Sequence, residues 1–158
     1  MKELTYEKAL HRSASLCSSG EHFSDEIHKK LLKWGISPSE ANRINDYLID
    51  EKYIDNHRFA RAYCLDKLRY NHWGRVKIQQ MLRMQGLEED AIRYGLLQIN
   101  DDEYLHIMDD VIAQKSRSLS NSNEKNDYQR KVKIVKHLLS RGFEMGIIVK
   151  RLDFSNPD

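Results

Sequence analysis

Apolar residues recur at helical spacing along most of the chain, and three of these patterns end in the same way. Aligned on Gly35, Gly86 and Gly142, each pattern has one apolar residue eight positions before the glycine and another four positions before it. These residues are Ile27, Leu31, Ile78, Leu82, Ile134 and Leu138. Positions four apart lie on one face of a helix, so each pattern predicts an amphipathic helix that ends at the glycine.

An apolar residue follows each of these glycines. Ile36, Leu87 and Phe143 come directly after them. Glycine adopts the left-handed conformation that often closes a helix at little cost, and the next apolar side chain then folds back onto that helix. After the first glycine, residues 37–40 (Ser-Pro-Ser-Glu) supply an N-cap, a proline at the first helical position and a capping box. Each glycine is therefore predicted to join two helices through a tight turn.

A further helical segment lies before each of these pairs, which gives three units of three helices. The segments cover roughly residues 5–17, 56–70 and 102–115. Because each unit would contact mainly its neighbours, the sequence predicts an all-α protein that forms an elongated array of three tandem three-helix repeats. The predicted units are residues 1–52, 53–100 and 101–158.

The last unit is longer than the others. Its glycine lies 56 residues after the preceding one, whereas the first two glycines are 51 residues apart. The excess falls in residues 114–128, which are rich in Ser, Asn and charged side chains. This composition is typical of an exposed, mobile loop, so a polar loop is predicted there.

Composition supports a helical protein with reduced thiols. Charged residues make up 32% of the chain, with two prolines and seven glycines, which favours helices over turn-rich β structure. Cys17 and Cys64 stand alone, so both are expected to be buried thiols. No apolar run reaches the roughly 18 residues that cross a bilayer, and the N-terminus lacks the apolar core of a signal peptide. A cytoplasmic protein without membrane contact is expected.

The sequence holds no recognisable catalytic constellation. It lacks the zinc-protease, phosphate-loop, dinucleotide-binding and nucleophile-elbow motifs, and its seven histidines are scattered. Acidic pairs such as Asp101-Asp102 and Asp109-Asp110 are explained by helix starts and solvated faces. The prediction is a binding protein with no catalytic residues, no metal site and no cofactor.

Positive charge is concentrated on one helix of each unit. The net charge of the chain is only +2, yet residues 58–83 contain seven Lys and Arg residues against one acid, Asp66. In each unit the helix that precedes the glycine carries cations beside or opposite its apolar stripe; these are Lys29, Lys30, Lys33, Arg75, Arg83, Arg130, Lys133 and Arg141. If the units stack, the cations form a discontinuous stripe suited to an extended acidic or nucleic-acid-containing surface, with salt-sensitive binding.

These motifs resemble those of the RecX family, the bacterial regulators of the RecA recombinase. Residues 53–87, which begin Tyr-Ile-Asp-Asn-His-Arg-Phe-Ala, resemble the central repeat of that family. The segments around Gly35 and Gly142 resemble its first and third repeats, so the resemblance covers nearly the whole chain. One departure is Trp73-Gly74-Arg75, where the family often has an aromatic residue, glycine and proline before the basic helix.

The resemblance implies a curved array that lies in the groove of the RecA filament on single-stranded DNA. Such a protein would act as a monomer in DNA repair and recombination by lowering the activity of the recombinase, with single-stranded DNA as a further contact. Several weak cationic contacts along its length would reinforce one another once the first has formed. The residues predicted to contact the partner are Lys30, Lys33, Arg69, Arg75, Arg83, Lys133 and Arg141.

Two other binding classes remain open. The sequence of helix, glycine and helix is shared with helix-turn-helix DNA-binding proteins, but the expected recognition helix, residues 88–97, begins with three acids that would face phosphate. A helical-repeat adaptor for another protein fits the periodicity equally well. Binding to duplex DNA without recombinase would favour the first alternative, and capture of a different partner from the native cytosol would favour the second.

Overall fold

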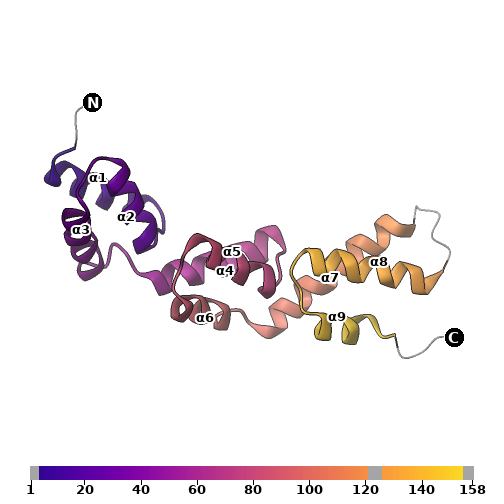
Figure 1. The fold of residues 1–158 in the computed structure, drawn as a ribbon. Helices are drawn as coiled ribbons and strands as arrows, with labels where there is room; N and C mark the ends of the chain where they lie inside the picture. Colours follow the sequence, from indigo (N-terminus) through magenta and orange to yellow (C-terminus); the bar gives the residue numbers. More distant parts are fainter. Residues whose placement is uncertain (1–3, 121–125, 155–158) are drawn as a thin grey trace.

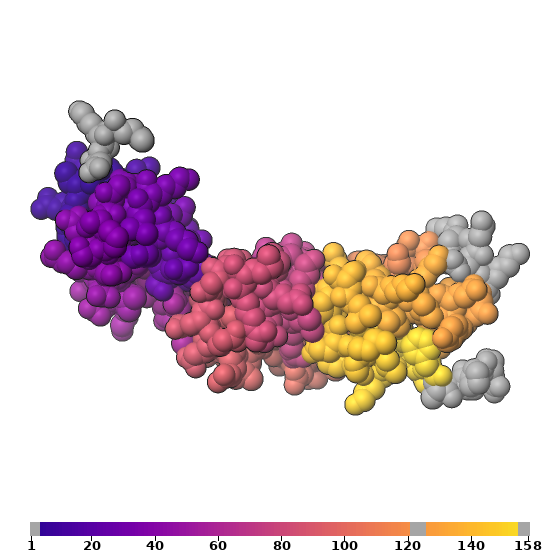
Figure 2. Space-filling model, viewed as in Figure 1, coloured from indigo at the N-terminus to yellow at the C-terminus, as the bar shows by residue number. Residues whose placement is uncertain are grey.

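The computed structural model describes residues 4–120 and 126–154. Within these ranges the chain forms nine helices and no strand, so the all-α prediction is confirmed. The helices follow one another in an elongated row, shown in Figure 1 and as a space-filling body in Figure 2. Their bounds are α1 Tyr6–Ser19, α2 Ser24–Lys33, α3 Pro38–Asp50, α4 Asn56–Asn71, α5 Arg75–Gln85, α6 Glu89–Leu97, α7 Asp101–Ser120, α8 Asp127–Ser140 and α9 Met145–Leu152.

The described helices group by threes. Helices α1 to α3 pack on one another, as do α4 to α6, while α8 packs on both α7 and α9 (Figure 1). We call these the first, central and third units. We propose unit boundaries after residues 52 and 100, since both positions lie between helices.

Three glycines end the middle helices of the units in the left-handed conformation. Gly35, Gly86 and Gly142 have φ angles of 89°, 90° and 93°. In each case the amide of the following apolar residue donates to a carbonyl five residues back, for example Phe143 N to Leu138 O at 3.1 Å. This bond satisfies a carbonyl that the end of the helix would leave unpaired, and it turns the apolar side chain into the core.

The predicted loop at residues 114–128 is wrong at both ends. Helix α7 continues to Ser120, and α8 begins at Asp127. Residues 121–125 lie outside the described residues. Helix α7 extends because Leu119, only 6% exposed, joins the same apolar cluster as Val111. Adding residues to a helix that already exists costs little, so one buried leucine outweighs the weak helix propensity of the serines around it.

The joint between the central and third units is built from backbone. At the start of α5, the amides of Gly74 and Val76 donate to Arg141 O at 2.8 Å and to Gly142 O at 2.9 Å. A Cβ atom at Gly74 would lie 2.4 Å from the Gly142 carbonyl carbon, so the two turns touch without a side chain between them. The C-terminal turn of α8 thus caps the N-terminus of α5, which pairs opposite ends of two helix dipoles.

Apolar contacts continue across this joint. One buried cluster runs through the central and third units from Phe59 to Ile148, whereas the first unit has its own cluster around Ile27 and Leu31. Only Phe23 of the first unit belongs to the larger cluster, where its ring lies 4.9 Å from that of Phe59. The central and third units therefore form one packed body.

Side chains make most of the joint between the first and central units. Arg58 donates through Nε to Glu21 at 2.6 Å and through its guanidinium to the carbonyls of Lys52 and Tyr53. The Asn56 amide donates to Ser24 Oγ at 3.0 Å. These groups remain partly exposed, where each polar contact adds little to stability.

The turns at residues 74 and 142 approach closely, so alanine should cost more stability at Gly142 than at Gly86, although both glycines have the same conformation. In Gly142→Ala the new Cβ would lie 2.3 Å from the Lys77 Cβ, whereas in Gly86→Ala the nearest atom is a flexible Asp25 carboxylate oxygen at 3.1 Å. Both variants carry a left-handed cost of about 1–2 kcal/mol. Gly142→Ala should lose roughly a further 1–3 kcal/mol of unfolding free energy through overpacking, measured by urea denaturation.

The exposed Gly146→Ala is the control, because nothing lies within 4 Å of its added Cβ. It should be as stable as the natural chain or slightly more so. Equal losses for Gly142→Ala and Gly86→Ala would show that the turn contact is not tight.

Candidate functional site

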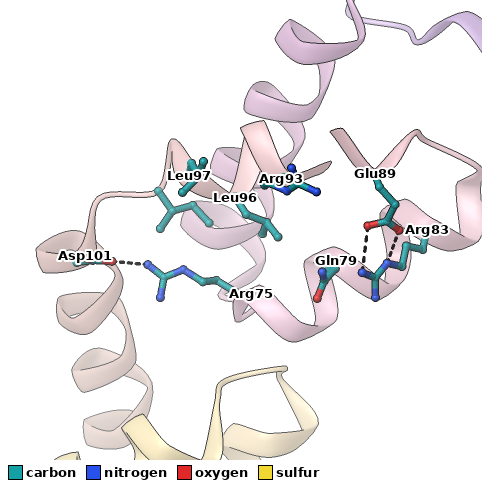
Figure 3. A pocket seen from close by; sticks show the side chains of 9 residues that line it. Arg75, Gln79, Arg83, Glu89, Arg93, Leu96, Leu97 and Asp101 are labelled. Carbon is teal, nitrogen blue, oxygen red and sulfur yellow. Dashed lines mark hydrogen bonds and ion pairs between the residues drawn. The ribbon is translucent and has the colours of Figure 1, made fainter. Parts of the chain in front are cut away.

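An open groove on the central unit lies between α5 and α6 and reaches the start of α7 (Figure 3). Its volume is about 580 Å³. Arginines line both walls, and leucines form part of the α6 side. The lining residues are Arg75, Gln79, Arg83, Glu89, Arg93, Leu96, Leu97, Ile99 and Asp101.

Helical spacing on α5 supplies one wall. Arg75, Gln79 and Arg83 follow at intervals of four residues, so they form a row along the helix. Ile78 and Leu82, both fully buried, hold the adjacent side of α5 against the core. The structure therefore brings two of the three central arginines predicted from the sequence, Arg75 and Arg83, into one groove.

Close packing of α6 on α4 fixes the other wall. A Cβ atom at Gly95 would lie 2.8 Å from the backbone and Cβ of Ala60, so these helices meet at two small residues. Arg93, Leu96 and Leu97 of α6 line the groove (Figure 3). None of these three residues was predicted from the sequence. The available signal was Leu97, which lies about 200° around α6 from the buried Gly95 and therefore does not face the same core.

Each of the three central arginines is paired with an acid of the same chain. Arg83 donates to both Glu89 oxygens at 2.6 and 3.0 Å (Figure 3). Arg69 lies outside the groove and donates to both Glu103 oxygens at 2.9 and 3.3 Å. The sequence predicted these arginines as outward cations, and their pairing with acids was not predicted. Such exposed pairs contribute at most about 1 kcal/mol each, so a partner's anion can replace the internal acid.

The Arg83 pair shifts both of its titrating groups. The hydrogen bond to Glu89 raises the pKa of Arg83, and the same bond is the main cause that lowers the pKa of Glu89. The bond to Glu103 likewise raises the pKa of Arg69. Arg69, Arg83 and Glu89 therefore stay charged at neutral pH.

Arg75 has a structural role as well as a place in the groove. Its guanidinium lies 4.0 Å from the Tyr104 ring centroid and donates to Asp101 at 2.6 Å and to Glu144 at 3.4 Å. Its backbone amide donates to the Tyr104 hydroxyl at 3.0 Å, and that hydroxyl donates to Glu144. Burial, followed by the bond to Glu144, raises the pKa of Tyr104. Arg75 thus ties α5 to α7 and α9.

The other predicted contact residues lie away from the groove. Lys30 and Lys33 are on α2 of the first unit, half-buried and exposed respectively. Lys133 is exposed on α8, and Arg141 caps the C-terminus of that helix. Within the described residues the Arg141 Nε is buried without a hydrogen-bond acceptor. Their role as outer contacts stays a prediction.

Neither a metal cluster nor a membrane-spanning helix occurs in the described part of the chain. Among residues 4–120 and 126–154, no three His, Cys, Asp or Glu side chains converge where they could hold a metal ion. None of the helices described there has the length and apolar character needed to cross a bilayer.

The described helices form three-helix units in a row, and this is the architecture of a helical-repeat protein. The central unit carries the charged groove. A family model described as the second three-helix domain of RecX matches residues 55–96, which cover the central unit. Curated relatives named regulatory protein RecX include one from Lactobacillus johnsonii, 29% identical over 137 residues, and one from Prosthecochloris aestuarii, 26% identical over 153 residues. The family model and these relatives support the resemblance of the chain to the RecX family.

Coverage differs between these relatives. The match to the Prosthecochloris protein covers 97% of both chains, and the match to the Lactobacillus protein covers 84% of this chain and 49% of the relative. The chain spans about half the length of the relatives from Lactobacillus johnsonii and Clostridium tetani.

Two solved structures share the fold. The crystal structure of RecX from Lactobacillus salivarius has a TM-score of 0.83 at 20% identity and covers 94% of this chain and 96% of its own. A second crystal structure of a regulatory protein RecX has a TM-score of 0.80 at 22% identity, over 93% of this chain and 72% of its own. The likeness shows the fold.

Removing the Tyr104 hydroxyl tests the link between the groove and the third unit. Tyr104→Phe leaves the Arg75 amide and the Glu144 carboxylate each without one partner, while the buried ring stays in place. The free energy of unfolding in urea should fall by about 1–3 kcal/mol. Tyr128→Phe, at a residue that is 65% exposed, is the matched control and should leave stability unchanged. Equal stability of the two variants would rule out a structural role for the Tyr104 hydroxyl.

Proposed function

We propose that this protein regulates the RecA recombinase by binding its filament on single-stranded DNA and lowering its activity in DNA repair and recombination. The observation that carries the proposal is an elongated body that resembles the RecX family, with basic side chains on all three units. An extended body can contact successive subunits of a polymer, whereas a compact one would reach fewer. The proposed setting is the cytoplasm, and the proposed acting form is a monomer.

Exchange of ion pairs provides a mechanism for binding in the groove. Glu89 and Asp101 neutralise Arg83 and Arg75 in the free protein, and both acids are themselves well exposed. A carboxylate or phosphate of the partner would take their place without burying an unpaired charge. The net gain per contact is small, so affinity has to come from several contacts made together.

The proposed contact residues fall into central and outer sets. Arg83 and Arg93 are the main candidates in the groove, because they line it together with the exposed Leu97 and are not needed for the joint to the third unit. Arg69 and Arg75 remain candidates, although Arg75 also holds α5 in place. The outer set is Lys30, Lys33, Lys133 and Arg141.

A helix-turn-helix mode of DNA binding has less support. The helix that would enter the major groove is α6, which starts with Glu89 and Asp90. Asp90 lies 3.0 Å from His57 Nε2, and Glu88 accepts from Asn56 at 3.3 Å. These acids surround the end of the helix that would have to approach phosphate, and an acid there repels it.

Two substitutions with opposite expected effects test the groove. Arg83→Glu places like charges at residues 83 and 89, and half-inhibition of filament ATP hydrolysis should require about tenfold more protein. Glu89→Gln removes the internal competitor, and half-inhibition should occur at lower protein concentration, by at most about fivefold. The measurement is the ATPase rate of RecA on single-stranded DNA at low salt.

Arg61→Glu serves as the control, since Arg61 is exposed on α4 and does not line the groove. Inhibition equal to that of the natural chain in both groove variants would show that another surface is used. A natural chain that neither binds the filament nor changes its ATPase rate would refute the proposed function itself.

A further inference from the structure

A second surface of the central unit combines aromatic rings with lysines. Tyr63, Lys67 and Tyr70 fall within about 60° on one side of α4, given a helical step of about 100°. Trp73 follows in the turn to α5, and Lys77 lies in the first turn of that helix. We call these five residues the aromatic–lysine face.

The two lysines of this face are held by aromatic rings. Lys67 Nζ lies 5.4 Å from the Tyr63 ring centroid and 4.9 Å from that of Trp73. Lys77 Nζ lies 4.7 Å from the Trp73 centroid. Cation–π contact orders an ammonium group without cancelling its charge. The Trp73 indole therefore fixes two positive charges close together.

These lysines differ from the neighbouring arginines in having no carboxylate. In the part of the chain that the structure describes, no salt bridge of 4.0 Å or less involves Lys67 or Lys77. Asp66 lies one turn before Tyr70 on α4, and it makes no salt bridge of 4.0 Å or less with Lys67. Positive charge here is available to a ligand without first displacing an internal acid.

One ring of the face has no packing role. Tyr70 is 80% exposed, whereas Tyr63 and Trp73 are half-buried against the core cluster. The exposed Tyr70 ring is therefore open to stacking by a flat ligand group, and its position beside ordered cations suits an anionic ligand that carries such groups. Flat rings alternating with cations fit a chain in which bases alternate with phosphates.

The face lies away from the arginine groove. Lys77 is two residues after Arg75, so their side chains leave α5 about 200° apart. The Lys77 backbone packs against Gly142, which places the face beside the joint with the third unit. A ligand here and a ligand in the groove would contact opposite sides of α5.

We propose that the aromatic–lysine face binds single-stranded nucleic acid directly. Phosphates contact the Lys67 and Lys77 ammonium groups, and a base stacks on Tyr70. An acidic protein segment would satisfy the two lysines but would make no use of the exposed ring, so the observations favour nucleic acid. The inference deepens the proposed function by assigning its DNA contact, and it requires binding in the absence of recombinase.

The test is binding of the full chain to a fluorescent oligothymidylate, measured by anisotropy at several salt concentrations. The double variant Lys67→Gln/Lys77→Gln should weaken binding about tenfold at low salt and reduce the slope of log K against log salt by about 1.4. Tyr70→Ala should weaken binding about fivefold or more with an unchanged slope, because it removes stacking and no charge.

The charge-matched control is Lys8→Gln/Lys136→Gln, which removes two exposed lysines from α1 and α8. It should bind within about twofold of the natural chain. Equal weakening in both double variants, or unchanged binding in Tyr70→Ala, would overturn the proposal. So would equal displacement by polyglutamate, since that would indicate a surface for acidic proteins.

The outcome is separable from that of the proposed function. A natural chain that inhibits the RecA ATPase but does not bind the oligonucleotide would refute this DNA contact while leaving filament regulation intact. Loss of oligonucleotide binding in Lys67→Gln/Lys77→Gln, with the groove residue Arg83 unchanged, would support two distinct contacts on one unit.

Discussion

The contact between two turns, at residues 74 and 142, is the constraint on which the rest of the structure depends. Because neither residue has a side chain, the carbonyls that end α8 reach the amides that begin α5. That contact sets the start of α5 and with it the direction of Arg75 and of Lys77. The groove and the aromatic–lysine face both take their geometry from this contact between two stretches of backbone.

The positive charge of a surface depends on which basic side chains are paired with acids, and not only on how many basic residues the segment contains. The basic segment around α4 and α5 loses much of its apparent excess, since Arg58, Arg69, Arg75 and Arg83 each contact an acid from another part of the chain. The lysines on Trp73 keep their charge because their partner is a ring. The charge of the most basic stretch of sequence is thus partly neutralised on the surface. Within the described residues, the positive charge that remains unpaired with an acid includes that of Lys67 and Lys77.

Local patterns predicted the architecture well, and long-range contacts explain what they missed. Helix ends at Gly35, Gly86 and Gly142 depend on a few neighbouring residues, so they could be recognised from the sequence. The extension of α7 depends on burial of Leu119, and the pairing of Arg69 with Glu103 joins residues 34 positions apart. A helical pattern predicts which face of a helix a residue lies on, but not which other element that face meets. Arg93 and Leu97 were therefore not predicted as groove residues.

The polar joint at residues 51–55 has a mechanical consequence. Arg58 and Asn56 hold the first unit mainly through exposed hydrogen bonds, whereas the central and third units share a continuous apolar interior. Bending the molecule at the first joint would break a few solvent-replaceable bonds and the Phe23–Phe59 ring contact, but bending it at the second would open the core. The molecule therefore consists of two rigid segments joined at one flexible joint. A force that bends the molecule would deform this joint first.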